Sequence, residues 1–187
     1  MPPLAEPAAP VIRPHPGLTP GGDAASLRRA YGCFPTGVVA VCALPRGDAP
    51  IGMAASSFTS VSLDPPLVSV CIQDTSTTWP RLRSMPTLGV SVLADGQAPL
   101  SRQLAGPAAG RFAALDPLVD AEGAVFIPGS TAHLSCTIAH EIAAGDHTLV
   151  LLRIRALLAD PGVEPLVFHA GTYRQLRVGD GGHRASR

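Results

Sequence analysis

The chain has 187 residues, of which 46% are hydrophobic and 15% are charged, and this composition excludes a wholly disordered chain and suits one folded domain. Fourteen arginines balance fourteen acidic residues, so the basic excess typical of nucleic-acid and membrane-surface binding is missing. Neither an apolar run of the roughly 18 residues that a membrane helix needs nor a signal-peptide pattern is present, and we expect a cytoplasmic protein with no membrane or nucleic-acid partner.

The two ends of the chain differ in composition from its centre. Residues 1–22 contain seven prolines and three glycines, which excludes a regular helix or a central strand and predicts an extended arm. Residues 179–187 are polar and predict a disordered tail. We therefore expect a single folded domain over residues 23–178.

Within this domain, strand patterns outnumber helix patterns. A helix is predicted over residues 23–31, with Asp23 as its N-cap, and further helices over residues 77–85 and 98–106. Apolar runs of strand length, several of them alternating, occupy residues 38–44, 67–72, 87–93, 133–144, 148–158 and 166–176. Many short strands with few helices predict a mainly β fold, an antiparallel sheet closed into a barrel.

One run of small residues, GMAASSFTSVSLDPP at residues 52–66, is unusual for the middle of a domain. A surface of Ala, Ser and Thr lets backbone amides approach a flat or anionic ligand closely. Hydroxyls and turn amides can hold a phosphate without a cationic side chain, which matters because the chain has no lysine. The alternative is a strand that packs closely against its neighbour, and the residue types alone leave both open.

Several common catalytic motifs are missing. The sequence has no G-x-G-x-x-G, no G-x-x-x-x-G-K-[ST] and no G-x-S-x-G, so no Rossmann site, P-loop or serine-hydrolase elbow is supported. His140, Glu141 and His147 do not have the H-E-x-x-H spacing, and no metal site is predicted. The four cysteines form no C-x-x-C pair, and we expect buried free thiols.

The series of motifs along the chain resembles the flavin reductase family, whose members are the small reductase components of two-component flavin monooxygenases. The matching stretches cover residues 24–178 in order: YGCFPTGVVAV (31–41), GMAASSFTSVSLDPPLVSVCI (52–72), STTWPRLR (76–83), GVSVLA (89–94), RF (111–112), GDHTLVLLRI (145–154) and PLVFHAGTYRQL (165–176). The resemblance implies an antiparallel split β-barrel that binds flavin, with a few short helices. It also implies a homodimer with the flavin near the subunit interface.

The resemblance also implies which residues bind the flavin. Ala54, Ala55, Ser56 and Ser57 match positions expected to contact the ring edge and the ribityl chain of the flavin. Thr36 would flank the cleft that holds the flavin. Cys71 and Ile72 match positions that pass beside the ring, Cys71 through its backbone and not its thiol. Ser76 and Thr78 match the hydroxyl pair that grips the phosphate at a helix start. The alternative for Ser76 is a plain N-cap.

His147, in the triplet GDH, is the residue that the resemblance marks as catalytic. It stands where relatives place a histidine near the nicotinamide and the reactive face of the flavin, and imidazole can donate a hydrogen bond or manage a proton near neutral pH. The alternative is a turn histidine that caps a strand. Two further choices stay open: Asp146 orients the imidazole or simply makes the turn, and Trp79 covers the adenine end of a larger flavin or belongs to the core.

The activity implied by the resemblance is NAD(P)H-dependent flavin reduction. A hydride passes from NADH or NADPH to N5 of FMN or FAD, and the reduced flavin goes to a partner monooxygenase. The chemistry belongs to the cofactors, while the protein orients them and excludes water. Two alternatives remain: a flavoenzyme of the same fold that acts on an organic substrate, and a non-catalytic flavin-binding module, against which the GDH triplet argues.

Overall fold

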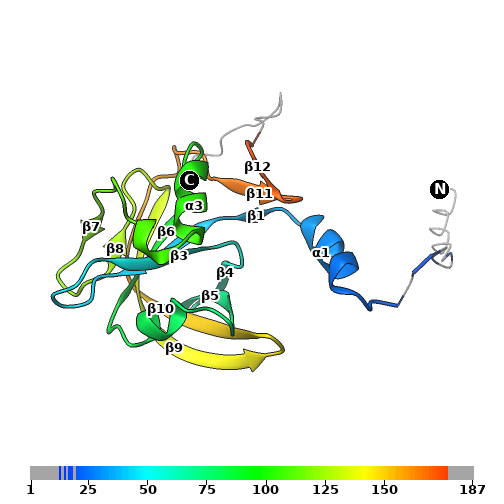
Figure 1. The fold of residues 1–187 in the computed structure, drawn as a ribbon, viewed down its shortest axis with the longest axis horizontal. Helices are drawn as coiled ribbons and strands as arrows, with labels where there is room; N and C mark the ends of the chain where they lie inside the picture. The colour runs from blue at the N-terminus through cyan, green and yellow to red at the C-terminus, as the bar shows by residue number, and fades with distance from the viewer. Residues whose placement is uncertain (1–12, 14, 16, 19, 177–187) are drawn as a thin grey trace, which may run out of the picture.

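The structure is a computed structural model that describes residues 13, 15, 17, 18 and 20–176 (Figure 1). The predicted tail over residues 179–187, and most of the predicted arm over residues 1–22, lie outside the described residues. The described chain is mainly β, with antiparallel sheets and three short α-helices, as the sequence predicts.

A seven-stranded antiparallel sheet forms the body of the molecule. Its strand order is β3-β2-β6-β9-β10-β5-β4, so the two end strands, β3 and β4, follow each other in the chain without pairing in a ladder. The strands are β2 (Val39–Ala43), β3 (Ile51–Ala55), β4 (Thr59–Leu63), β5 (Pro66–Gln73), β6 (Leu88–Val92), β9 (Ala132–Ala144) and β10 (His147–Ala159). The sheet is therefore open between β3 and β4.

Two smaller antiparallel sheets flank this body. Strand β1 (Thr36–Gly37) pairs with β11 (Val167–His169), which pairs with β12 (Thr172–Arg174), and β7 (Leu118–Val119) pairs with β8 (Val125–Phe126). The prediction of one strand over residues 166–176 was wrong. Ala170 and Gly171 have φ angles of 50° and 77°, a left-handed pair that turns the chain into the β11–β12 hairpin.

The helices are α1 (Ala24–Gly32), α2 (Trp79–Arg83) and α3 (Ala98–Ala105), and the 3-10 helix η1 (Ala108–Gly110) follows α3. Asp23 is the predicted N-cap, because its Oδ1 accepts a hydrogen bond of 2.7 Å from the Ser26 N–H. Helix α1 stands apart from the body of the molecule in Figure 1, and none of its residues is buried. A helix of this length gains little stability by itself.

The core has two parts, one on each face of β2. Every residue of β2 is buried: Val41 belongs to the cluster among the sheet strands, and Cys42 to the cluster under α3. Strand β8 crosses close to β6 at Gly89, where an added Cβ would collide with the Val125 carbonyl oxygen and lie 2.8 Å from its nitrogen. Glycine is needed at this crossing because two backbones meet there.

Three further expectations concern membranes, metals and thiols. In the described part of the chain, no helix is both long and apolar enough to cross a bilayer. The same residues contain no group of three or more potential ligands that could hold a metal ion. Cys42 and Cys136 are buried free thiols as expected, whereas Cys33 is exposed and Cys71 is half-buried, so the expectation was wrong for Cys33.

Candidate functional site

The ladder between β5 and β10 brings three of the predicted residues together. His147 lies opposite Gln73, and Leu149 lies opposite Cys71, so His147 and Cys71 are two positions apart on the same face. Ile72 points to the other face, where its side chain is 1% exposed and packs in the core. A ligand beside Cys71 and His147 could therefore contact Ile72 only through its backbone.

Ser57 connects the chain after β3 to the middle of β5. Its Oγ accepts a hydrogen bond of 2.9 Å from the Cys71 N–H and donates one of 3.0 Å to the Cys71 carbonyl oxygen. The β4–β5 ladder reaches only as far as the pair Thr59 and Ser69, so a serine side chain takes the place of a paired strand at this point. The Cys71 N–H is thereby engaged by the protein itself.

The two alanines of the small-residue run contribute to packing. Ala54 and Ala55 are half-buried opposite Ala40 and Val39 of β2, and each packs against a different core cluster. The side chains of Ala54 and Ala55 thus serve close packing between strands, which was the alternative to a surface that lines a ligand. Ser56, the next residue, is exposed.

Thr36 approaches from a different sheet. It lies in β1 opposite Phe168 of β11, three residues before Val39. Since Val39 pairs with Ala55 at the last position of the β2–β3 ladder, Thr36 lies beyond the end of β3 that leads into Ser56 and Ser57.

Ser76 and Thr78 have different contacts although they are two residues apart. The Ser76 Oγ accepts a hydrogen bond of 3.2 Å from the Trp79 N–H and so caps the start of α2 from outside the helix, whereas the N-cap position itself is occupied by Thr78, whose side chain makes no capping bond. The Thr78 Oγ1 accepts a hydrogen bond of 2.6 Å from Nη1 of Arg111. The two hydroxyls thus face different surroundings: Ser76 lines a 130 Å³ hollow next to Trp79, and Thr78 lines a larger cavity.

Arg111 is the residue that sequence reasoning missed. Its Nη1 also donates to the Gly52 carbonyl at 2.8 Å, and its Nε donates to the Gly106 carbonyl at 2.9 Å. Among the described residues no carboxylate lies within 4.0 Å of it, so its positive charge is held in place by neutral acceptors only. The sequence analysis placed no cationic side chain beside the predicted phosphate-binding hydroxyls, and the structure brings Arg111 to one of them, Thr78. The available signal was the RF pair at residues 111–112.

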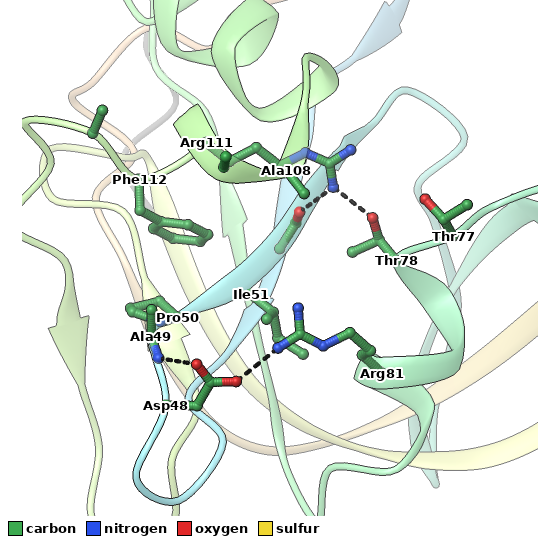
Figure 2. Close-up of a pocket in the computed structure, with 13 residues that line it drawn as sticks. Asp48, Ala49, Pro50, Ile51, Thr77, Thr78, Arg81, Ala108, Arg111 and Phe112 are labelled. Atoms are coloured by element: carbon green, nitrogen blue, oxygen red, sulfur yellow. Dashed lines mark hydrogen bonds and ion pairs between the residues drawn. The ribbon is translucent and has the colours of Figure 1, made fainter.

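A cavity of about 490 Å³ opens beside the contact between Arg111 and Thr78 (Figure 2). Its second charged group is an ion pair of 2.9 Å between Nη2 of Arg81 and Oδ2 of Asp48. The apolar part of the wall consists of Pro50, Ile51, Phe112 and alanines of the segment around η1. The cavity therefore combines two guanidinium groups, one carboxylate, threonine hydroxyls and a flat apolar wall.

His147 is held by its sequence neighbour. Its Nδ1 lies 2.7 Å from Oδ1 of Asp146, and since a carboxylate only accepts, Nδ1 carries the proton and Nε2 remains available. This hydrogen bond holds the pKa of the Asp146 carboxyl below its ordinary value. The His147 side chain is 39% exposed, so it can reach a ligand from solvent. Of the two roles considered for Asp146, orienting the imidazole or only making the turn, the hydrogen bond supports the first.

Trp79 belongs to the core. Its side chain is 7% exposed, and its Nε1 donates a hydrogen bond of 3.1 Å to Oε1 of Glu141. Arg83 pairs with the other oxygen of Glu141 at 2.6 Å. These contacts fix α2 against β9. Of the two roles considered for Trp79, a cover for the adenine end of a flavin or a core residue, the structure supports the core residue.

Several known proteins and solved structures are similar to this chain, and their names describe flavin reductases or reductase subunits. A curated relative, the NADH-dependent FAD reductase of Streptomyces globisporus, is 39% identical over 173 residues, which are 90% of this chain and 94% of that protein. The reductase subunit HsaB of a flavin-dependent monooxygenase from Mycobacterium tuberculosis is 32% identical and covers 81% of each chain. Among solved structures, the NADH:FAD oxidoreductase SgcE6 of Streptomyces globisporus, in complex with NAD and FAD fragments, has a TM-score of 0.81 and 37% identity, with 89% of this chain and 100% of that chain covered.

The family comparison covers nearly all of the described domain. Residues 31–177 match the family described as "Flavin reductase like domain", and this range begins at Tyr31 in α1 and includes every strand. The same range contains all the residues predicted to bind a flavin. The chain therefore belongs to the flavin reductase-like family.

Proposed function

We propose that this protein is a flavin reductase that binds FMN or FAD, reduces it with NADH or NADPH, and supplies the reduced flavin to a partner monooxygenase. The observation that carries the proposal is the charged corner of Arg111 and Thr78, which lies directly against Gly52 of β3. Arg111 is a fixed cation that has no acidic partner in the part of the chain the structure describes, and its place beside the small-residue run suits a ligand that is flat at one end and anionic at the other.

The residues fit a flavin by the chemistry of their donors. Arg111 and Thr78 offer N–H and O–H groups to a phosphate, in a position that neutral backbone carbonyls have already fixed. Ser56 and Ser57 lie further along the chain from Gly52, at the end of β3, and provide exposed and half-buried hydroxyls for a polar chain or ring edge. Phosphate-binding and ring-binding groups thus follow one another along one strand.

We assign the remaining residues by their surroundings. Cys71 forms part of the surface under the flavin ring, which we call the floor of the site. Its N–H donates to Ser57 and is therefore not free to bind the ring. Ile72 supports that floor from the core, and Thr36 closes its far end. Ser76 orders the turn into α2 through its cap and so positions Thr78. Ala54 and Ala55 allow close approach of the backbone while they pack on β2.

When bound, the flavin supplies a ring that accepts electrons from a reduced nicotinamide, and that chemistry belongs to the two ligands. The protein's part is to orient them. His147 presents Nε2 to the ligand because Asp146 holds Nδ1, which suits a hydrogen bond to the nicotinamide. The imidazole is not needed to move a proton at the hydride donor.

The split barrel and the homodimer belong to the same proposal. The core cluster among the sheet strands draws residues from β2 and β3 at one end of the strand order and from β5 near the other, which is typical of a sheet that curls toward closure. Helix α1 leaves Leu27, Tyr31 and the following Phe34 exposed at 37%, 69% and 73%. A second copy that covers this apolar strip would give the helix the packing it lacks.

The partner monooxygenase is proposed from relatives such as the reductase subunit HsaB. Such a role requires that reduced flavin leaves the protein. The candidate site is compatible with release, because His147, Ser56 and the Arg81–Asp48 pair are accessible from solvent.

The test is oxidation of NADH or NADPH by the purified protein with excess FMN, FAD or riboflavin, followed by the nicotinamide absorbance. We expect turnover of free flavin with at least one nicotinamide. Turnover of tightly bound flavin alone would favour a same-fold enzyme with an organic substrate. Flavin binding without any turnover would indicate a binding module. The absence of both flavin binding and turnover would overturn the proposal.

A further inference from the structure

We propose that Arg81, held by Asp48 at the far side of the 490 Å³ cavity, binds the second phosphate of FAD and makes FAD the preferred flavin over FMN. This inference rests on the proposed function and deepens it. It assigns a specificity role to Arg81 and Asp48, to which the sequence analysis gave none.

The cavity is lined both by the corner of Arg111 and Thr78 and by the Arg81–Asp48 pair. Arg111 and Thr78 form one charged end, and Arg81 lies three residues after Thr78, one helical turn further along α2. Both arginines line the same cavity (Figure 2). FMN ends at its single phosphate, whereas FAD continues through a second phosphate into adenosine. A second guanidinium in the same cavity, carried by a residue one turn after Thr78, is available to the longer ligand.

The two arginines differ in how firmly they are held. Arg111 donates to two carbonyls and one hydroxyl and has no acidic partner among the described residues. Within the described part of the chain, the Arg81 side chain bonds only the carboxylate of Asp48, and the two side chains are 52% and 57% exposed. An exposed pair of this kind contributes little and is readily exchanged. A phosphate can accept two hydrogen bonds from a guanidinium and therefore binds it more strongly than the single contact with Asp48 does.

The rest of the wall suits the adenosine end. Pro50, Ile51 and Phe112 provide apolar surface between the charged groups, and Thr77 adds a hydroxyl. The volume lies in the range of pockets that hold small organic ligands. Asp48, in this arrangement, competes with the ligand for Arg81, so the carboxylate lowers affinity for FAD and favours its release.

The experiment measures binding of FAD, FMN and ADP to the flavin-free protein by isothermal titration calorimetry. The variants are Arg81→Gln and Asp48→Asn. Arg46→Gln is the matched control, because Arg46 is exposed on the same loop as Asp48 and lies outside this cavity. Circular dichroism and melting temperature of each variant confirm that it is folded.

We expect Arg81→Gln to weaken FAD and ADP by about tenfold or more and FMN by less than about threefold, and Asp48→Asn to strengthen FAD about threefold. Arg46→Gln should leave all three within about twofold. An equal loss for FAD and FMN, or no loss for FAD, overturns the inference. If the proteins bind no flavin at all, the proposed function itself has failed, which is a distinct outcome.

Discussion

Ser57 and Cys71 are joined by a double hydrogen bond in which one serine Oγ satisfies both the N–H and the carbonyl of a strand residue. The contact lies at the place where β4 no longer pairs with β5, and it fixes the loop after β3 against the middle of β5. Because Ser57 also belongs to the small-residue run, the stability of the domain and the shape of the candidate site depend on the same side chain.

Replacement of Ser57 by alanine should therefore affect both properties. It leaves a half-buried N–H and carbonyl without their partner, and we expect a loss of about 1–3 kcal/mol in the free energy of unfolding. Flavin affinity should fall as well, because the loop is released. Denaturant unfolding and flavin titration measure the two effects. Ser60→Ala, on the exposed side of β4, is the control and should change neither.

Replacement of His147 by alanine tests its assignment to the nicotinamide. We expect the KM for NADH or NADPH to rise about tenfold while the Kd for flavin changes less than about twofold, because His147 lies at the solvent side of the β5–β10 ladder. Steady-state kinetics and a flavin titration separate the two. His140→Ala, an exposed histidine on β9, is the control. A loss of flavin affinity equal to the rise in KM would contradict the assignment.

Replacement of Arg111 by glutamine should distinguish flavins by their phosphate. We expect affinity for FMN and FAD to fall about tenfold or more, and affinity for riboflavin, which has no phosphate, to stay nearly constant. Arg111 also ties β3 to the segment after α3, so the melting temperature will fall in parallel. Arg111→Lys keeps the charge, and partial recovery of FMN binding in that variant separates charge from structure. Equal losses for all three flavins would argue against phosphate binding.

The cysteines should differ sharply in reactivity. Burial raises the pKa of Cys42 and of Cys136 from 9.0 to about 12, so both remain neutral thiols in the folded protein at pH 8. A thiol reagent should label exposed Cys33 first, and all four cysteines only after unfolding, as mass spectrometry can measure. Fast labelling of Cys42 in the folded protein would contradict its burial.

The same shifts make stability depend on alkaline pH. A raised pKa means that the folded state holds the proton more tightly, so this contribution is fully present below pH 9.0 and is lost as the pH rises toward about 12. We expect the free energy of unfolding to decline across this window. Cys42→Ala removes one of the two groups and should make the decline shallower.

Gly89 provides a test of the packing between β6 and β8. An alanine Cβ there collides with the backbone of Val125, and a backbone cannot move aside like a side chain, so we expect Gly89→Ala to destabilise the fold by more than about 3 kcal/mol. Gly37→Ala is the control, because nothing lies within 4 Å of a Cβ at that position. Chemical denaturation compares them, and similar stabilities would show that the crossing relaxes easily.

The sequence predicted the elements in which apolar residues alternate clearly or a cap is explicit. Helix α1 follows the N-cap at Asp23, and β5, β6, β9 and β10 lie where strand patterns were identified. The division of the small-residue run into β3 and β4 leaves no such pattern, because Ala, Ser and Thr do not mark one face as apolar. The β11–β12 turn was missed because Ala170, a residue that rarely adopts positive φ, does so here.

The candidate site was predicted less completely than the fold. The resemblance named residues on β5 and β10, which strand pairing brings together, and residues at the end of β3, of which Ser57 reaches β5 through its side chain. Arg111 was missed because it lies 33 residues from Thr78 in the chain, and only the folded structure brings the two into contact. The same holds for Arg81 and Asp48, which are also 33 residues apart.

The packing of β2 on both of its faces limits where the molecule can open. Strand β3 is laddered to β2 along its whole length and cannot shift without disturbing two cores at once. The 44–50 turn and helix α2, by contrast, meet across the cavity through the Arg81–Asp48 contact at the protein surface. We therefore expect a reduced flavin to leave on this side of the cavity, because an exposed ion pair separates more easily than strand β3 can shift.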